Sequence, residues 1–147
     1  MTRESPTMHG HQLCFEDVKI GTALTPLVKR PTTVQLFRFS AVTWNAHRIH
    51  FDKPYALTEG YPDVLVQAHL HGSFLYQAVA DWAGPRARVL RFRWQNRSIA
   101  IPGDVLTCSG TVAKADEGVV ECELEERNQK GELCASGWAR IELPRRS

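Results

Sequence analysis

Residues 64–84 read VLVQAHLHGSFLYQAVADWAG, the longest stretch of this sequence in which apolar residues recur at helical spacing. The apolar positions are Val64, Leu65, Val66, Ala68, Leu70, Phe74, Leu75, Ala78, Val79 and Trp82. They nearly encircle a helix, so the stretch predicts a buried helix rather than one that lies on a surface. The Gly84-Pro85 pair that follows is typical of a helix end.

Beyond Pro85 the pattern changes to the alternation of apolar and polar residues that is typical of strands. Four segments carry it: RVLRFRWQNRSIAI (88–101), DVLTCSGTVAKAD (104–116), GVVECELEERN (118–128) and LCASGWARIEL (133–143). The separators IPGD, ADEG and NQKG are rich in turn residues, which predicts a meander of about four antiparallel strands. One buried helix followed by such a sheet indicates the α+β class. A curved sheet wrapped around the helix satisfies this pattern, and other α+β sheets satisfy it as well.

The residues before the buried helix predict shorter elements. A strand-like stretch in ALTPLVKRP (23–31) is followed by Thr32-Thr33, which can cap a short helix that begins at Val34. A second short helix is expected over residues 53–58, with Pro54 in its first turn. We expect a flexible segment over residues 1–13, a single domain over 14–143 and a tail over 144–147.

Composition narrows the class of protein. The chain has 147 residues, 43% of them hydrophobic, which suits one domain with its own core. A net charge of +2 offers no general attraction to nucleic acid, and no apolar run approaches a membrane span. The start lacks the apolar core of a signal peptide, and the four cysteines form no CxxC pair. We therefore expect free thiols, a cytoplasmic location, and no nucleic-acid or membrane partner.

A polar bend, TWNAHRIHFD (43–52), separates the two short helices. It is open to interpretation as a surface loop, a metal site or a catalytic centre. His47 and His50 could ligate a metal, but no cysteine or carboxylate cluster completes such a site, so we predict none. A histidine beside an amide, here Asn45, suits acid–base catalysis because free histidine titrates near 6.5.

The start of the buried helix is a second candidate for chemistry. Its first backbone N–H groups lack intrahelical partners and lie at the positive end of the helix dipole, where they can stabilise an oxyanion. His69 and His71 lie two residues apart there and face different sides, which favours core or interface roles for them. No GxSxG elbow and no glycine-rich phosphate loop is present, so we predict no cofactor.

Two motifs together resemble a known family. FSAVTWNAHRIHFDKPYA (39–56) and EGYPDVLVQAHLHGSFL (59–75) are similar to the MaoC-like (R)-specific enoyl-CoA hydratases, which have the hotdog fold of a long helix in a curved sheet. The wording N-x-H-R-I-H and EGYP resembles, more narrowly, the branch of mesaconyl-C4-CoA and itaconyl-CoA hydratases. A weaker likeness joins YQAVADWAGP (76–85) to small subunits of steroid side-chain hydratases, which work as heteromers.

The resemblance implies roles for the bend. Aligned on D-x-N-P-x-H, His50 takes the catalytic histidine position, Asn45 the aspartate position and His47 the asparagine position. The implied reaction is reversible addition of water to an enoyl-CoA, with His50 as general base and Asn45 or His47 as the second group. Arg48 is then a candidate to bind a carboxylate of a dicarboxylic acyl group, or else forms an ordinary salt bridge with Asp52 or Glu59.

The resemblance also implies a substrate contact at the helix start. The family's V-H-G step corresponds here to Val66, Gln67 and Ala68, so the usual histidine and glycine are replaced. The Ala68 N–H is predicted to stabilise the enolate oxygen, and Gln67, Ala68 and His69 to lie beside the acyl-CoA. The arginines of residues 86–97 are candidates for the phosphates of CoA.

Two rival functions stay open. A hotdog thioesterase would need an acidic residue on the central helix, and residues 65–76 contain none. A non-catalytic or co-catalytic subunit of a heteromeric hydratase is supported by the Gln67-Ala68 replacement. We expect a homodimer or higher homo-oligomer, or a heteromer with another hotdog subunit.

Overall fold

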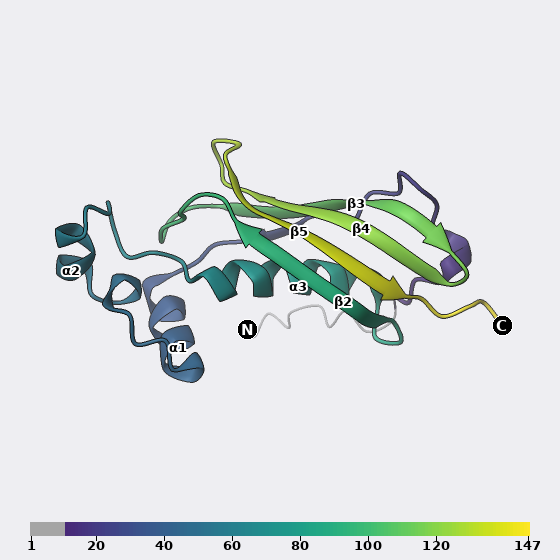
Figure 1. The fold of residues 1–147 in the computed structure, drawn as a ribbon, viewed down its shortest axis with the longest axis horizontal. Coiled ribbons are helices and arrows are strands. Elements are labelled where there is room, and N and C mark those ends of the chain that lie inside the picture. The colour runs from purple at the N-terminus through teal and green to yellow at the C-terminus, as the bar shows by residue number, and fades with distance from the viewer. Residues whose placement is uncertain (1–10) are drawn as a thin grey trace, which may run out of the picture.

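The computed structural model describes residues 11–147, and a helix packed in a curved antiparallel sheet dominates it (Figure 1). The helices are α1 (Thr33–Thr43), α2 (Lys53–Thr58) and α3 (Ala68–Ala83), with single 3-10 turns η1 (Phe15–Asp17) and η2 (Arg48–His50). The strands are β1 (Leu27–Lys29), β2 (Arg88–Asn96), β3 (Leu106–Asp116), β4 (Val119–Arg127) and β5 (Leu133–Glu142). The predicted α+β class and the single hotdog fold are confirmed.

The five strands lie in the order β1-β3-β4-β5-β2, and every pairing is antiparallel. The predicted meander is correct for β3, β4 and β5, which follow one another across tight turns. It is wrong for β2, which pairs with β5 at the far edge instead of with β3. In the segment between β2 and β3, Ala100 O accepts a backbone hydrogen bond from Val66 N–H, just before α3 (2.9 Å).

Helix α3 begins at Ala68, four residues later than the apolar run predicts. The preceding residues are extended because their backbone groups bond elsewhere: Leu65 N–H donates to Ile49 O (2.9 Å) and Val66 N–H to Ala100 O (2.9 Å). The helix is also less enclosed than expected, since Ser73 and Tyr76 on one face stay exposed. The sheet therefore covers one side of α3 and leaves a strip of the other open.

The core lies between α3 and the concave face of the sheet. The helix contributes Phe74, Leu75, Ala78 and Val79, all buried, and the strands contribute alternate residues. All four cysteines (Cys14, Cys108, Cys122 and Cys134) are free and buried, as expected. Burial raises the pKa of the Cys122 thiol to about 12, so that group stays a protonated, inert packing residue.

Helices α1 and α2, with η2 between them, extend beyond the sheet at one end of the molecule (Figure 1). Thr32 caps α1 as expected, because its hydroxyl accepts from Gln35 N–H (3.1 Å). Asp52 caps α2 in the same way at Tyr55 N–H (3.2 Å), with Pro54 in the first turn. The Asp52 cap marks the end of the polar bend, whereas the bend begins at Trp44, where α1 ends.

The ends of the described chain attach to the domain. The predicted flexible segment 1–13 falls largely outside the described residues, but Gln12 and Leu13 both donate hydrogen bonds to Ala83 O. In the predicted tail, Pro144 O accepts from Phe15 N–H (2.9 Å). No helix within residues 11–147 has the length and apolarity needed to cross a membrane.

One polar pair is enclosed in the core. His71 of α3 hydrogen-bonds Glu126 of β4, and both side chains are almost completely buried (1% and 0% exposed). Cys108 on the neighbouring strand donates its thiol to the other carboxylate oxygen (3.7 Å). The core role expected for His71 is thus realised, whereas Glu126 was not anticipated. Its inward position could have been recognised from the alternation of Cys122, Leu124 and Glu126 along β4.

The buried pair of His71 and Glu126 leads to a prediction for the free energy of unfolding. Glu126→Ala should lower the free energy of unfolding by about 3–5 kcal/mol, because it leaves the His71 imidazole buried without its partner. The double variant Glu126→Met with His71→Leu, which removes both polar groups, should recover most of that loss. Urea unfolding measures both. Equal losses of unfolding free energy in the single and the double variants would show that leaving His71 without its partner costs no more than removing both polar groups.

Candidate active site

The polar bend and the start of α3 come together at one place in the fold. The backbone N–H of Leu65 donates to Ile49 O, and the His50 ring donates from Nδ1 to Leu65 O (2.8 Å). Leu65 lies only three residues before Ala68, the first residue of α3. The structure therefore brings the predicted histidine and the predicted helix N-terminus into one neighbourhood.

The bend itself forms because α1 stops at a residue with left-handed backbone. Trp44 has φ 54° and stands 92% exposed, and Asn45 N–H then bonds back to Ser40 O (3.0 Å). The Asn45 side-chain oxygen accepts from His47 N–H (3.3 Å), which tightens the turn. This hydrogen bond uses the carbonyl end of the amide, so the NH2 group of Asn45 is the part left to hold a water or a substrate.

His50 has the geometry of a general base. A carbonyl oxygen can only accept, so the contact with Leu65 O places the proton on Nδ1 and leaves Nε2 of the neutral ring with a free lone pair. The side chain is 8% exposed. Burial lowers the pKa of His50 below its usual 6.5, the Leu65 carbonyl opposes this, and the charge of nearby His47 lowers it further.

These causes predict a pH profile. A general base acts only when neutral, so if His50 is the base of a hydratase, kcat/KM for hydration should rise with pH along a curve whose midpoint lies below 6.5. His47→Asn removes the neighbouring positive charge and should move that midpoint upward. The same replacement at the exposed His11 is the control. A midpoint that does not move in His47→Asn would mean that His47 has no electrostatic influence on the base.

Two further histidines near the candidate site, His47 and His69, are exposed. His47 is exposed and its ring meets that of His50 at 5.9 Å between centroids, close enough to share a ligand. His69 is also exposed, and its ring packs against Trp94 at 5.5 Å. Among residues 11–147, no group of three or more histidine, cysteine or carboxylate side chains is placed to hold a metal ion.

Arg48 forms the salt bridge with Asp52. Its Nε and one terminal nitrogen donate to the same carboxylate oxygen (2.9 and 2.6 Å), and the guanidinium lies over the Tyr55 ring at 4.4 Å. Arg48 and the Tyr55 N–H hold the pKa of Asp52 below its usual value. A substrate carboxylate would have to compete with this arrangement. Glu59, the other acid considered, does not take part in it.

Gln67 is buried rather than open to a ligand. It is 0% exposed, and its side-chain NH2 donates to Leu36 O (2.7 Å) and Ser40 Oγ (2.9 Å) on α1. Its side-chain oxygen has no hydrogen-bond partner within the described residues. Gln67 thus ties the helix that leads into the bend to the N-terminus of α3, a role that required the tertiary structure to be recognised.

Ala68 is exposed at the first position of α3, where a backbone N–H has no intrahelical acceptor. Its carbonyl oxygen accepts from Trp94 Nε1 (3.1 Å), which attaches the helix start to β2. Gly72 permits this contact, since a Cβ there would lie 2.5 Å from the Trp94 ring. The N-terminus of α3 is therefore attached to β2 through Trp94 and, through Gln67, to α1.

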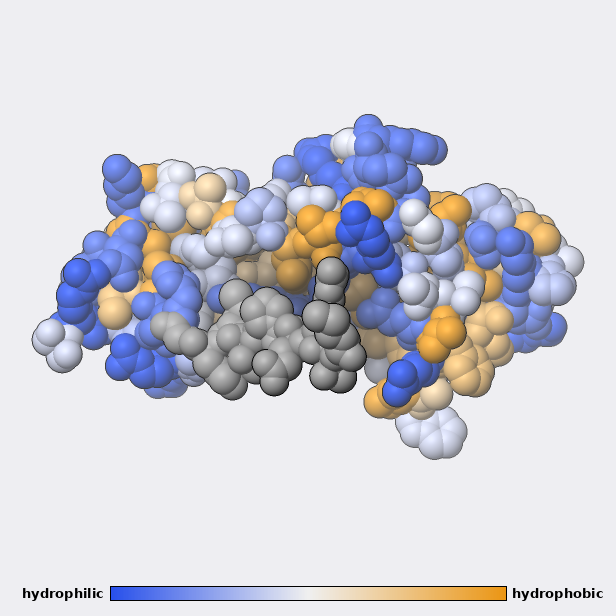
Figure 2. Space-filling model, turned by 180° about the vertical axis from the view of Figure 1, so that it is seen from behind, coloured by the Kyte–Doolittle hydropathy of each residue, from blue (hydrophilic) through white to orange (hydrophobic). Residues whose placement is uncertain are grey.

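A hollow of about 340 Å³ adjoins Asn45. Its other lining residues are mostly apolar: Phe37, Ser40, Ala41, Trp44, Ala46 and Phe51. Hydrophobic side chains gather at the end of the molecule that holds α1 (lower right in Figure 2), and Phe37 and Val42 there are 59% and 79% exposed. An apolar group attached to a ligand at Asn45 would find contacts here.

Residues 18–102 match the family model of hydroxyacyl-thioester dehydratase type 2. The chain belongs to this family. The match contains the whole bend and the whole of α3, so the family's similarity covers both parts of the candidate site. The predicted MaoC-like membership is confirmed.

Two curated relatives show partial similarity. A mesaconyl-C(4)-CoA hydratase of Chloroflexus aurantiacus is 64% identical over 36 residues, 24% of this chain and 13% of the relative. The 3-oxo-4,17-pregnadiene-20-carboxyl-CoA hydratase beta subunit of Mycobacterium tuberculosis is 26% identical over 87 residues, 57% of this chain and 65% of the relative. The chain thus spans less than two thirds of either relative.

Solved structures share the fold. An R-hydratase of Pseudomonas aeruginosa superposes with a TM-score of 0.86 at 21% identity, covering 92% of this chain and 88% of that one. The ChsH1–ChsH2 complex of Mycobacterium tuberculosis gives a TM-score of 0.79 at 21% identity, covering 85% of this chain and 98% of the matched chain. At this identity the likeness concerns the hotdog fold.

Proposed function

We propose that this chain catalyses the reversible hydration of an enoyl-CoA to a 3-hydroxyacyl-CoA. The observation that carries the proposal is His50: its Nδ1 is committed to Leu65 O, and its Nε2 is left as a base beside the start of α3. A hydroxyacyl-thioester dehydratase family match over both segments supports the same reaction.

In the hydration direction, His50 Nε2 takes a proton from a water molecule while the water oxygen bonds to the β-carbon of the enoyl group. The electron pair of the double bond moves toward the thioester carbonyl, whose oxygen gains negative charge. The Ala68 N–H at the positive end of α3 stabilises that enolate oxygen. The enolate then collapses as the α-carbon takes a proton from the second acid–base group, and His50 gives up the proton from the water to restore that group, directly or through solvent. The reverse sequence is dehydration.

Asn45 holds the water in this proposal, because an amide has no basic nitrogen to take a proton. His47, exposed and near His50, is the candidate for the second acid–base group. The acyl group is an apolar or branched one. The apolar hollow beside Asn45 supports this choice, and the pairing of Arg48 with Asp52 weighs against a dicarboxylic group.

A panel of CoA thioesters tests the reaction. The purified chain should consume branched and linear enoyl-CoAs, which is measured as a loss of the absorbance of the conjugated thioester. The product, 3-hydroxyacyl-CoA, should be identified by mass spectrometry. A thiol reagent added in parallel should detect no free CoA. Steady release of CoA without hydration would instead assign a thioesterase.

Asn45→Asp separates an orienting role from an acid–base role. Aspartate keeps the oxygen that accepts from His47 N–H, so the turn should survive and kcat should stay within a few-fold of the parent or increase. Asn45→Leu, similar in size but without polar atoms, should lose at least about tenfold in kcat. A severe loss in Asn45→Asp would mean that the uncharged amide itself is required.

A second candidate function is that of a subunit that works only beside another hotdog chain. Two features favour it: Gln67 is a buried structural residue, and Ala68 stands where the family resemblance implies a glycine at the helix start. The relative from Mycobacterium tuberculosis is described as a beta subunit. Inactivity of the pure chain, with activity restored by a second hotdog subunit, would support this alternative.

A further inference from the structure

The side chain that stands at the start of α3 does not cap the helix. Gln67 is the N-cap of α3, yet its side chain makes no hydrogen bond to the first turn. A capping side chain normally accepts from the second or third N–H of a helix. The NH2 group of Gln67 instead donates to Leu36 O (2.7 Å) and Ser40 Oγ (2.9 Å) on α1. No capping side chain therefore competes with a substrate for the N–H groups at this helix start.

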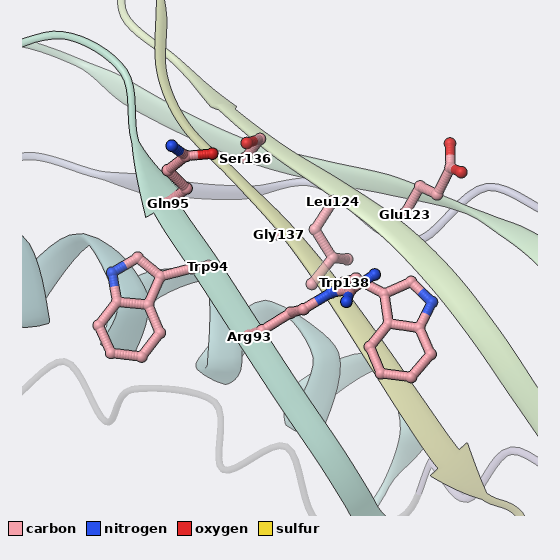
Figure 3. A pocket seen from close by; sticks show the side chains of 8 residues that line it. All are labelled: Arg93, Trp94, Gln95, Glu123, Leu124, Ser136, Gly137 and Trp138. Carbon is pink, nitrogen blue, oxygen red and sulfur yellow. The ribbon is translucent and has the colours of Figure 1, made fainter.

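The peptide unit between Gln67 and Ala68 has a fixed direction. Gln67 O accepts from the N–H groups of Leu70 (3.0 Å) and His71 (3.2 Å), so this carbonyl points into the first turn of α3. The C=O and N–H groups of a trans peptide unit point in opposite directions, so the Ala68 N–H points away from the helix. Trp94, which Figure 3 shows projecting from β2, donates from Nε1 to Ala68 O (3.1 Å) and fixes the next peptide unit.

Ser40 connects Gln67 to the polar bend. Its Oγ accepts from Gln67, and its backbone oxygen accepts from the N–H groups of Trp44 and Asn45, the latter at 3.0 Å. Ser40 is 5% exposed and Gln67 is 0% exposed, so water has little access to the contact between them. A continuous path of hydrogen bonds therefore runs from Asn45 through Ser40 to the residue whose peptide unit carries the first N–H of α3.

Stability alone does not account for glutamine at position 67. Its side-chain oxygen is buried and has no hydrogen-bond partner within the described residues. A buried acceptor without a donor lowers the stability of a fold. An apolar side chain of similar length, such as methionine, fills a similar space without this penalty. What glutamine adds is the pair of NH2 hydrogen bonds that attach α1 to the start of α3.

We infer that Gln67 is a positioning residue, which sets the amide of Asn45 and the N–H of Ala68 in fixed relation to one substrate. The inference rests on the proposed hydration, in which Asn45 holds the water and Ala68 N–H stabilises the enolate oxygen. His50 is attached to the same segment through Leu65 O (2.8 Å), so residues 65–68 hold all three groups. A misplacement of about 1 Å between reacting groups can lower a rate by about 100-fold.

Gln67→Met tests this role, because it removes both NH2 hydrogen bonds and keeps an unbranched side chain. We expect kcat for enoyl-CoA hydration to fall about 10- to 100-fold and KM to change by less than about threefold, since misplaced groups slow the chemical step. The melting temperature should stay close to that of the parent, because the unpaired oxygen is removed as well. Initial rates over a range of enoyl-CoA concentrations separate kcat from KM.

Ser40→Ala removes one of the two acceptors and should lower kcat by less than Gln67→Met does. The double variant should lose no more than Gln67→Met alone, because the two residues share one contact. Gln77→Met is the control: Gln77 lies in a later turn of α3, donates to Asp81 (3.3 Å), and should leave kcat unchanged when replaced. A lower melting temperature with kcat unchanged in Gln67→Met would assign Gln67 a purely structural role and overturn the inference. Fully additive losses in the double variant would overturn it too.

Amide hydrogen exchange, followed by NMR, tests the same attachment without any assay of activity. The Asn45 N–H, which donates to Ser40 O, should exchange at least about tenfold faster in Gln67→Met than in the parent, because the end of α1 loosens locally. Gln77→Met should leave this rate unchanged. A parent chain that hydrates no enoyl-CoA would refute the proposed reaction, whereas an unchanged exchange rate of Asn45 in Gln67→Met overturns the positioning role whether or not the parent is active.

Discussion

His50→Asn should lower kcat for enoyl-CoA hydration by at least about 100-fold, the usual scale for removing a general base. Asparagine is chosen because its NH2 group lies on Cγ, where His50 Nδ1 lies, and can still donate to Leu65 O, so the bend keeps its attachment to the segment before α3. An amide nitrogen takes no proton at neutral pH, so only the base is lost. KM should change little, because the imidazole is not expected to contribute most of the binding of CoA.

His11→Asn is the matched control, since His11 is exposed and lines a hollow near Gly84, at the opposite end of α3 from Ala68. It should leave kcat unchanged. Initial rates over a range of enoyl-CoA concentrations separate kcat from KM, and thermal melts show whether the variants fold. Undiminished turnover in His50→Asn would remove His50 from the mechanism and leave His47 as the candidate base.

The short helices and the tight turns were predictable because a few neighbouring residues determine each of them. Thr32 is a capping residue at the expected place, and the helix 53–58 has Pro54 in its first turn as expected, with Asp52 as its cap. The turn between β3 and β4 needs two residues with positive φ, and the ADEG sequence supplies Glu117 and Gly118 (φ 47° and 85°). Such features depend on a few neighbouring residues, which a sequence displays openly.

The order of the strands was not predictable in the same way. Alternation identifies β2 as a strand, but its partner strand depends on the path of the chain between Arg97 and Val105. On this path, Arg97 N–H donates to Cys134 O, and Ala100 O accepts from Val66 N–H. These bonds join segments more than 30 positions apart in the chain. No local pattern reports them, so a simple meander was the natural expectation.

The sequence predicts which residues of the site carry reactive groups better than it predicts which residues hold them in place. The wording of the bend identifies His50 and Asn45, and the helix start identifies Ala68. Gln67 was expected to meet the substrate, whereas its side chain lies buried against Leu36 and Ser40. Burial of a polar side chain depends on which helix packs over it, and the residues of α1 that bond Gln67 are 27 and 31 positions away in sequence. The arrangement turns an expected contact residue into a support for the site.

Ala68→Pro should reduce kcat by about 10²–10³-fold, the cost of losing one oxyanion donor, while it leaves the fold intact. Proline lacks the backbone N–H, yet it is favoured at the first helical position, where that N–H has no intrahelical partner. The residue before a proline must be extended, and Gln67 already is, with φ −65° and ψ 145°. The carbonyl oxygen that accepts from Trp94 Nε1 is retained.

Ala68→Ser is the control, because it keeps the N–H and adds a small polar side chain at an exposed position. It should keep kcat within a few-fold of the parent. Single-turnover rates with excess enzyme isolate the chemical step from binding, and the melting temperature of Ala68→Pro should stay close to that of the parent. Because proline removes one hydrogen-bond donor and little else, activity that survives in a folded Ala68→Pro would place the oxyanion contact elsewhere than the first N–H of α3.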